Sequence, residues 1–377
     1  MEKKIIYLDH AATTATRPEV VDAMLPYFTE NFWNPSSVYT PALNNRKVVD
    51  ESRETIARSL GTTPENIYFT AGGSESDNWA LKCTAEAYAN KGKHIITSKI
   101  EHHAILHTCE YLEKKGFEIT YIDVDENGIL KLDDLKAAIR PDTILISVMF
   151  ANNEIGTVQP IKELCDVAHE NGSLFHTDAV QAVGHISINV HNLGVDMLSA
   201  SAHKFNGPKG VGFLYIRNGI EILPYSDGGA QESGLRAGTE NIAGIVGMAV
   251  ALKNNCDALE ENVKHVRGLE SKLVDMLDNT GIQYTRNGGA DRLPGLVSLS
   301  FPGIEGEAIL HRLDLNGICV STGSACNSKS TEVSHVLQAI RLEDSYAKGT
   351  IRISLGKANT EDEVEAIFNA LVKIFRI

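Results

Sequence analysis

The chain has 377 residues, 43% hydrophobic and 22% charged, a balance typical of a globular protein large enough for two domains. Its 35 basic and 49 acidic residues give a net charge of −14, which argues against direct nucleic-acid binding as the main activity. The sequence has no apolar run long enough for a membrane span and no secretory signal at its start, so we expect a cytoplasmic location and no membrane partner.

The first part of the chain predicts an apolar run at 5–8 and a helix from about Pro18, with a capping box formed by Thr16 and Glu19. Helices are expected over 42–60 and 75–90, with a strand at 67–70. Strand-like runs then alternate with helix-like runs: strands at 94–97, 118–122, 143–150, 173–176, 195–198 and 210–216, and helices at 104–115, 132–139 and 161–171. This alternation predicts an α/β fold with a mostly parallel sheet covered on both faces.

After Asn241 the pattern changes to a long helical region that ends near 279 and has a break at 254–257. Strands at 296–301 and 350–355, helices at 307–315 and 331–340, and a last helix capped by Thr360 follow. We therefore predict a large domain over 15–255 and a small α+β domain over 256–377, with an N-terminal segment, 1–14, joined to them.

Lys204 follows a run of small residues at the end of a predicted strand and precedes a glycine-rich loop. The small neighbours leave room for a large group, and desolvation would lower the pKa of this amine, as imine formation with a carbonyl requires. Asp178 ends a second strand-like run. Alone, Lys204 is typical of a surface loop and Asp178 of a turn. Together they favour pyridoxal 5'-phosphate, which needs an imine-forming lysine and a carboxylate facing its ring nitrogen.

Two further stretches suit this chemistry. Gly72-Gly73-Ser74 precedes a predicted helix, as in phosphate sites at helix N-termini, although the same residues form ordinary helix caps. Cys326 lies in a run of small polar residues, 321–331, which predicts an exposed loop and a reactive thiol, with Lys329 favouring the thiolate. The remaining cysteines form no Cys-x-x-Cys pair, and we interpret them as free packing residues in a reducing compartment: Cys83, Cys109, Cys165, Cys256 and Cys319.

The sequence resembles the cysteine desulfurases of the nitrogen-fixation and iron–sulfur cluster assembly type, a class-V aminotransferase-like family of fold-type I pyridoxal phosphate enzymes. The matching stretches are 7–14, 34–37, 69–76, 101–104, 152–156, 175–181, 199–212, 236–241 and 321–326. The resemblance implies a large domain with a mostly parallel, seven-stranded type of sheet. It also implies that L-cysteine is converted to alanine and a persulfide on Cys326, with delivery to an iron–sulfur scaffold protein or a thiolation carrier.

The resemblance also assigns roles to individual residues. Lys204, His102 and Cys326 would be catalytic, with His102 stacked on the cofactor ring. The implied cofactor contacts are Gly73, Ser74, His102, Asn153, Asp178, Gln181, Ser201, His203 and Lys204, with Thr239 contributed by the second subunit of a homodimer. Arg352 would hold the substrate carboxylate with help from Asn34, and Asn153 would face the substrate. No metal site is expected, apart from a transient contact between Cys326 and an iron–sulfur centre.

Three alternatives stay open. A selenocysteine lyase or an aminotransferase would share Lys204 and Asp178 without needing a thiol at position 326, and an aminotransferase would consume a keto acid. A non-catalytic sulfur carrier would not need to keep the cofactor residues.

The sequence after Cys326, Asn-Ser-Lys-Ser-Thr-Glu-Val, departs from the Thr-Ser-x-Ser-Leu-Glu-Pro common in the family, and the chain ends at Ile377 without the tail that docks a scaffold in many members. These departures leave the sulfur acceptor open.

Overall fold

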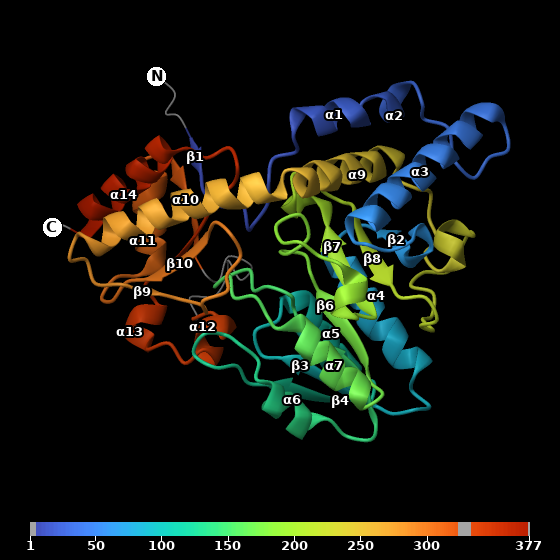
Figure 1. Cartoon of the computed structure of the whole chain (residues 1–377), viewed down its shortest axis with the longest axis horizontal. Helices are drawn as coiled ribbons and strands as arrows, with labels where there is room; N and C mark the ends of the chain where they lie inside the picture. The colour runs from blue at the N-terminus through green and yellow to red at the C-terminus, as the bar shows by residue number, and fades with distance from the viewer. Residues whose placement is uncertain (1–4, 323–332, 376–377) are drawn as a thin grey trace.

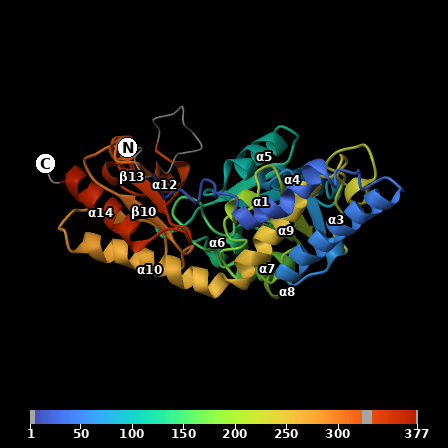
Figure 2. The ribbon, with the colours of Figure 1, turned by 90° about the horizontal axis from the view of Figure 1, so that it is seen from above.

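The structure is a computed structural model that describes residues 5–322 and 333–375. The described residues form a larger and a smaller lobe that lie side by side (Figure 1). A view from above shows the same division, with α9 in the larger lobe and α10 in the smaller one (Figure 2).

The larger lobe is built on a seven-stranded sheet with the strand order β2-β8-β7-β6-β5-β3-β4. The strands are β2 (Ile67–Thr70), β3 (His94–Ser98), β4 (Glu118–Ile122), β5 (Thr143–Ser147), β6 (Leu174–Asp178), β7 (Met197–Ser201) and β8 (Gly212–Ile216). The pairs from β7 to β4 are parallel, and β8 is antiparallel to both of its neighbours. The predicted mostly parallel sheet is therefore confirmed.

Helices cover both faces of this sheet. Successive strand residues point to opposite sides, and those on both sides are apolar and pack against helices. Ile95 belongs to an apolar cluster with α4 (Gly73–Ala87) and α5 (His103–Glu113), whereas Ile96 belongs to another with α3 (Thr40–Ser59), α7 (Ile161–Glu170) and α9 (Ile242–Asp257). The shorter helices of this lobe are α1 (Pro18–Met24), α2 (Pro26–Thr29), α6 (Leu132–Ala138) and α8 (Val190–Leu193).

The smaller lobe contains a four-stranded antiparallel sheet in the order β12-β13-β10-β9. Its strands are β9 (Thr285–Arg286), β10 (Leu296–Ser300), β12 (Ser321–Thr322) and β13 (Thr350–Ser354), and its helices are α10 (Leu259–Asp278), α11 (Gly306–Asp314), α12 (His335–Ala339), α13 (Asp344–Ala347) and α14 (Glu361–Phe375). The N-terminal strand β1 (Ile6–Tyr7) pairs in parallel with β11 (Ile318–Cys319), and Leu8 is buried in this lobe's core. The domain division at residue 256 stays a prediction.

Three helix starts or breaks differ from the prediction. The capping box of Thr16 and Glu19 is wrong: α1 has Arg17 as its N-cap, without a side-chain cap, because the Thr16 hydroxyl donates to the Gly207 carbonyl at 3.2 Å. Only Ala258 separates α9 from α10, slightly later than the predicted break. The helix predicted from 331 begins at His335, where the Ser334 hydroxyl caps it. Within the described ranges, no helix has the length and apolar character that crossing a membrane requires.

Candidate active site

A cavity of about 670 Å³ opens where the parallel strands of the large sheet end. Ligands of open α/β sheets bind at the carboxyl ends of such strands. The loops after β2, β3, β5, β6 and β7 line the cavity together with residues 11–13, and β13 contributes a side chain from the smaller lobe.

Most of the predicted site residues line this cavity: Gly73, Ser74, His102, Asn153, Asp178, Gln181, Ser201, His203, Lys204 and Arg352. Asn34 and Thr239 are exposed in the single chain and do not line it. Cys326 lies outside the described residues. The roles proposed for these three residues therefore stay predictions.

Lys204 lies on a 3₁₀ turn, Ala202–Lys204, directly after β7. Its Nζ atom donates to the carbonyl oxygens of Ala11 at 2.6 Å and Ala12 at 2.8 Å. Gln181 Nε2 also donates to the Ala11 carbonyl, at 3.0 Å. The N-terminal segment thus lines the cavity and fixes the position of the Lys204 ammonium group through these two hydrogen bonds. The motif at 7–14 was noticed in the sequence, but it gave no sign of which residues would contact Lys204.

One end of the cavity is shaped to receive an anion. Gly72 has φ 149°, which disfavours other residues, and a Cβ on Gly73 would lie 2.5 Å from Val180 Cγ2. The first N–H groups of α4 lack intrahelical partners, and Gly73, Ser74 and Glu75 at the start of this helix line the cavity. Burial, followed by the charges of Lys204 and Lys209, lowers the pKa of His203 to about 4. A neutral imidazole and two nearby ammonium groups suit a phosphate group.

The other end of the cavity suits a protonated ring nitrogen. Asp178 ends β6, is buried, and accepts a hydrogen bond from Val180 N at 3.0 Å. Burial raises the pKa of Asp178, while His102, the Val180 N–H group and Lys204 oppose that shift. His102 caps α5 by accepting from Ala104 N at 3.1 Å through Nδ1, so its neutral form carries the proton on Nε2. Burial lowers the pKa of His102, which favours that neutral form. The cavity therefore fits pyridoxal phosphate.

Arg352 is on β13 but is only 3% exposed, so it is not on the solvent face that an alternating strand would suggest. Its Nη2 atom donates to Asp9 Oδ1 at 2.7 Å and its Nη1 atom to the Asn153 carbonyl at 2.8 Å. Its Nε atom is buried and has no hydrogen-bond partner among the described residues. An unpaired guanidinium donor beside the cavity suits a carboxylate ligand. Sequence reasoning missed Asp9, the residue that orients this arginine.

The five described cysteines lie outside the cavity lining. Burial raises the pKa of Cys83 to about 11 and that of Cys165 to about 12, and it raises the pKa of Cys109 even further. These thiols stay protonated near neutral pH and are poor nucleophiles. Their environments agree with the interpretation that they are packing residues.

Two buried carboxyl groups near the cavity, Asp77 and Glu101, were not singled out as site residues from the sequence. Glu101 Oε1 accepts from the Ser98 hydroxyl at 2.5 Å and from Met149 N at 3.0 Å. Its Oε2 atom has no partner among the described residues, and burial raises the pKa of Glu101 to about 8. The group is therefore protonated in the folded protein at neutral pH and ionised in the unfolded chain.

This difference predicts that stability depends on pH. Because the folded pKa lies above the unfolded value, the contribution of Glu101 is fully present below pH 4.5 and is lost as the pH rises to about 8. Where the pH lies well between these two values, the free energy of unfolding should fall by about 1.4 kcal/mol per pH unit for this group, and urea unfolding between about pH 5.5 and 7 measures it. Glu101→Gln should remove that slope, whereas the exposed control Glu54→Gln should keep it. Equal slopes in both variants would contradict the assignment.

Comparison with known proteins agrees with this geometry over nearly the whole chain. The model of the family "Aminotransferase class-V" matches residues 6–367. A protein named "Cysteine desulfurase IscS" from Clostridium botulinum is 50% identical over 376 residues, which cover 99% of this chain and 95% of that protein. The solved structure of a "NIFS-LIKE PROTEIN" superposes with a TM-score of 0.93 at 40% identity, covering 98% of this chain and 99% of that one. Another, "SspA in complex with cysteine", has a TM-score of 0.83 at 36% identity and covers 94% of this chain and 100% of that one.

Proposed function

This chain belongs to the class-V aminotransferase family, and on that premise we propose that it is a cysteine desulfurase that uses pyridoxal 5'-phosphate. The observation that carries the proposal is the joint presence of Lys204 and Asp178 in one cavity at the carboxyl edge of the sheet. Full-length similarity to a protein named cysteine desulfurase supports the choice of substrate over the aminotransferase alternative.

The residues that would hold the cofactor divide into two groups. Lys204 would hold it covalently through Nζ, and Asp178 would face its ring nitrogen. The phosphate would lie against the start of α4 with these contacts: Gly73, Ser74, Ser201 and His203. Asn153 and Gln181 would contact the ring, with His102 stacked on it. When bound, pyridoxal phosphate supplies an electron sink that stabilises negative charge on the substrate's α-carbon.

Arg352 would bind the α-carboxylate of L-cysteine. Asp9 and the Asn153 carbonyl fix the guanidinium plane, so its remaining N–H donors, the unpaired Nε–H among them, are already oriented when the substrate arrives. Because these contacts come from the N-terminal segment, the large sheet and β13, the substrate would be held where the two lobes meet. Asn34 is proposed to assist from outside the single-chain cavity.

Proton movement would depend on Lys204 and His102. The Lys204 amine would accept the proton from the substrate's α-carbon as a general base. The low pKa of His102 keeps its imidazole neutral, and Nε2 could then donate or return a proton near the substrate sulfur. Asp178, as an anion, would hold the proton of the cofactor's ring nitrogen.

Cys326 would take the sulfur. Its thiolate attacks the substrate sulfur, the Cβ–S bond breaks with its electron pair on Cβ, and a proton added to Cβ gives alanine. The sulfur then stays on Cys326 as a persulfide. We propose an iron–sulfur scaffold protein or a thiolation carrier as the acceptor.

A homodimer would complete the site by bringing Thr239 of a second copy to the phosphate. An exposed apolar surface on α1, α2, the segment that joins α2 to α3 and the start of α3 suits such an interface: Val21, Leu25, Phe28, Phe32, Val38, Tyr39 and Leu43. Exposed Thr239 and Asn34 belong to the same lobe as this surface.

The test is to incubate the cofactor-loaded protein with L-cysteine and a thiol reductant and to measure alanine and sulfide. Cys326→Ala should abolish both products, whereas Cys319→Ala, a matched change on β11, should leave them within about twofold of the unmodified protein. Alanine formation that survives Cys326→Ala would instead favour a lyase. A requirement for a keto acid would favour an aminotransferase.

A further inference from the structure

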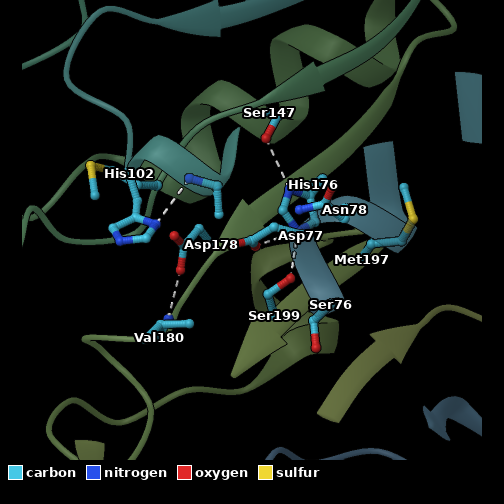
Figure 3. A network of polar contacts seen from close by, with 12 residues as sticks. Ser76, Asp77, Asn78, His102, Ser147, His176, Asp178, Val180, Met197 and Ser199 are labelled. Atoms are coloured by element: carbon cyan, nitrogen blue, oxygen red, sulfur yellow. Dashed lines mark hydrogen bonds and ion pairs between the residues drawn. The ribbon is translucent and has the colours of Figure 1, made fainter. Parts of the chain in front are cut away.

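Asp77 is a buried acid that the proposed reaction leaves without a role. It lies in the first turns of α4 and is 1% exposed. One oxygen of Asp77, one oxygen of Asp178 and a ring nitrogen of His102 lie within 4.8 Å of one another. Figure 3 shows Asp77 lying between Asp178 and His176. Asp77 therefore directly neighbours the carboxylate that the cofactor ring would face.

The groups around Asp77 supply no positive charge. His176 Nε2 lies 3.8 Å from Asp77 Oδ1, but burial lowers the pKa of His176 to about 3, so this imidazole is neutral. The hydroxyl groups of Ser147 and Ser199 contact the two ring nitrogens of His176, each at 2.9 Å. Asp77 Oδ1 has no hydrogen-bond partner among the described residues. An ionised Asp77 would be a buried and poorly compensated charge.

Asp178 has the better environment for a negative charge. It accepts the Val180 N–H group, and His102 and Lys204 lie on its cavity side. Asp77 instead faces Asp178, whose negative charge disfavours a second one beside it. Two buried carboxylates this close cannot both ionise readily, and different environments decide which one keeps the proton.

The strand register explains why these polar groups share one buried strip. Asp178 on β6 is the partner of Ser199 on the parallel strand β7, so their side chains lie on the same face of the sheet. His176 is two residues before Asp178 and lies on that face too. Ser199 also hydrogen-bonds to Asp77 from α4. Asp77 on α4 therefore packs against the polar residues of this sheet face, and Asp178 is the one of them at the cavity.

We propose that Asp77 and Asp178 share one proton, that the proton resides on Asp77, and that Asp77 is thereby a positioning residue that leaves Asp178 as the anion facing the cofactor. This inference rests on the proposed function, because it assigns Asp178 to the cofactor ring. In this proposal Asp77 acts only by keeping Asp178 ionised, and it does not contact the substrate.

Infrared spectroscopy of the holoenzyme tests where the proton resides. Labelling aspartate alone with ¹³C at the side-chain carboxyl shifts the signals of these residues away from those of buried glutamates such as Glu101. We expect a protonated aspartic acid carbonyl band at pH 7 that Asp77→Asn abolishes. A band that persists in Asp77→Asn, or no such band in the unmodified protein, would overturn the proposal. The measurement needs no turnover, so failure to form alanine would count against the proposed function alone.

Cofactor affinity gives a second readout. Because asparagine resembles a protonated aspartic acid, Asp77→Asn should change the dissociation constant for pyridoxal 5'-phosphate by less than about threefold. Asp178→Asn removes the charge that would hold the ring and should weaken binding by at least about tenfold. An Asp77→Asn effect as large as that of Asp178→Asn would mean that Asp77 carries the charge. If Asp77→Asn does not fold, Ser199→Ala should shift the aspartic acid band by removing its hydroxyl partner, and an unshifted band would overturn the proposal.

Discussion

Replacing Lys204 with alanine is expected to reduce alanine formation from L-cysteine by about 10³-fold or more. The change removes both the covalent link to the cofactor and the proposed base, and a positioned general base alone contributes about 10²–10⁴-fold. The rate of alanine formation by purified protein measures this. No other predicted site residue combines the two roles.

Lys204→Arg is the matched control for charge and hydrogen bonding. Arginine can still donate to the carbonyl oxygens of Ala11 and Ala12, which hold the lysine in the structure, but it cannot form the covalent link. We expect both variants to be inactive. Borohydride should attach the cofactor permanently to the unmodified protein and to neither variant. Turnover within tenfold of the unmodified protein in either variant would show that Lys204 is not the linking residue.

Arg352→Gln is expected to lower kcat/KM for L-cysteine by about 10²-fold, mainly through a higher KM. The physical reason is the loss of a desolvated, charge-assisted contact with the substrate carboxylate, which is worth about 2–5 kcal/mol. Steady-state kinetics over a range of L-cysteine concentrations measures the effect.

Cysteamine, which lacks the carboxylate, separates this role from a structural one. If Arg352 binds the carboxylate, Arg352→Gln should greatly reduce the preference for L-cysteine over cysteamine in competitive binding to the holoenzyme. Asp9→Asn provides a milder control, because it weakens the hold on Arg352 but keeps the guanidinium group. An equal loss of affinity for both compounds would contradict carboxylate binding.

The order of strands and helices was predictable because each element is indicated by residues that are neighbours in the sequence. Strand-like runs separated by helix-like runs indicated the parallel sheet, and Lys204 and Asp178 could be placed at strand ends because each follows such a run. Parallel strands bring their carboxyl ends to one edge, so the two residues meet although 25 residues of sequence separate them.

The contacts between residues far apart in the sequence were not predictable in the same way. Asp9 and Arg352 lie at opposite ends of the chain, and nothing local to either one indicates the other. The capping box at Thr16 failed for a related reason, since a distant backbone carbonyl, that of Gly207, takes the hydroxyl group. Asp77 has an ordinary helical context in the sequence, and its importance comes only from the strand register that places Asp178 beside it.

The most direct test of the central claim is mass spectrometry of the cofactor-loaded protein after one turnover with L-cysteine in the absence of reductant. The account predicts one additional sulfur atom on the peptide that contains Cys326, together with an equal amount of alanine. Alanine without added sulfur on that peptide, or added sulfur on another cysteine, would contradict it.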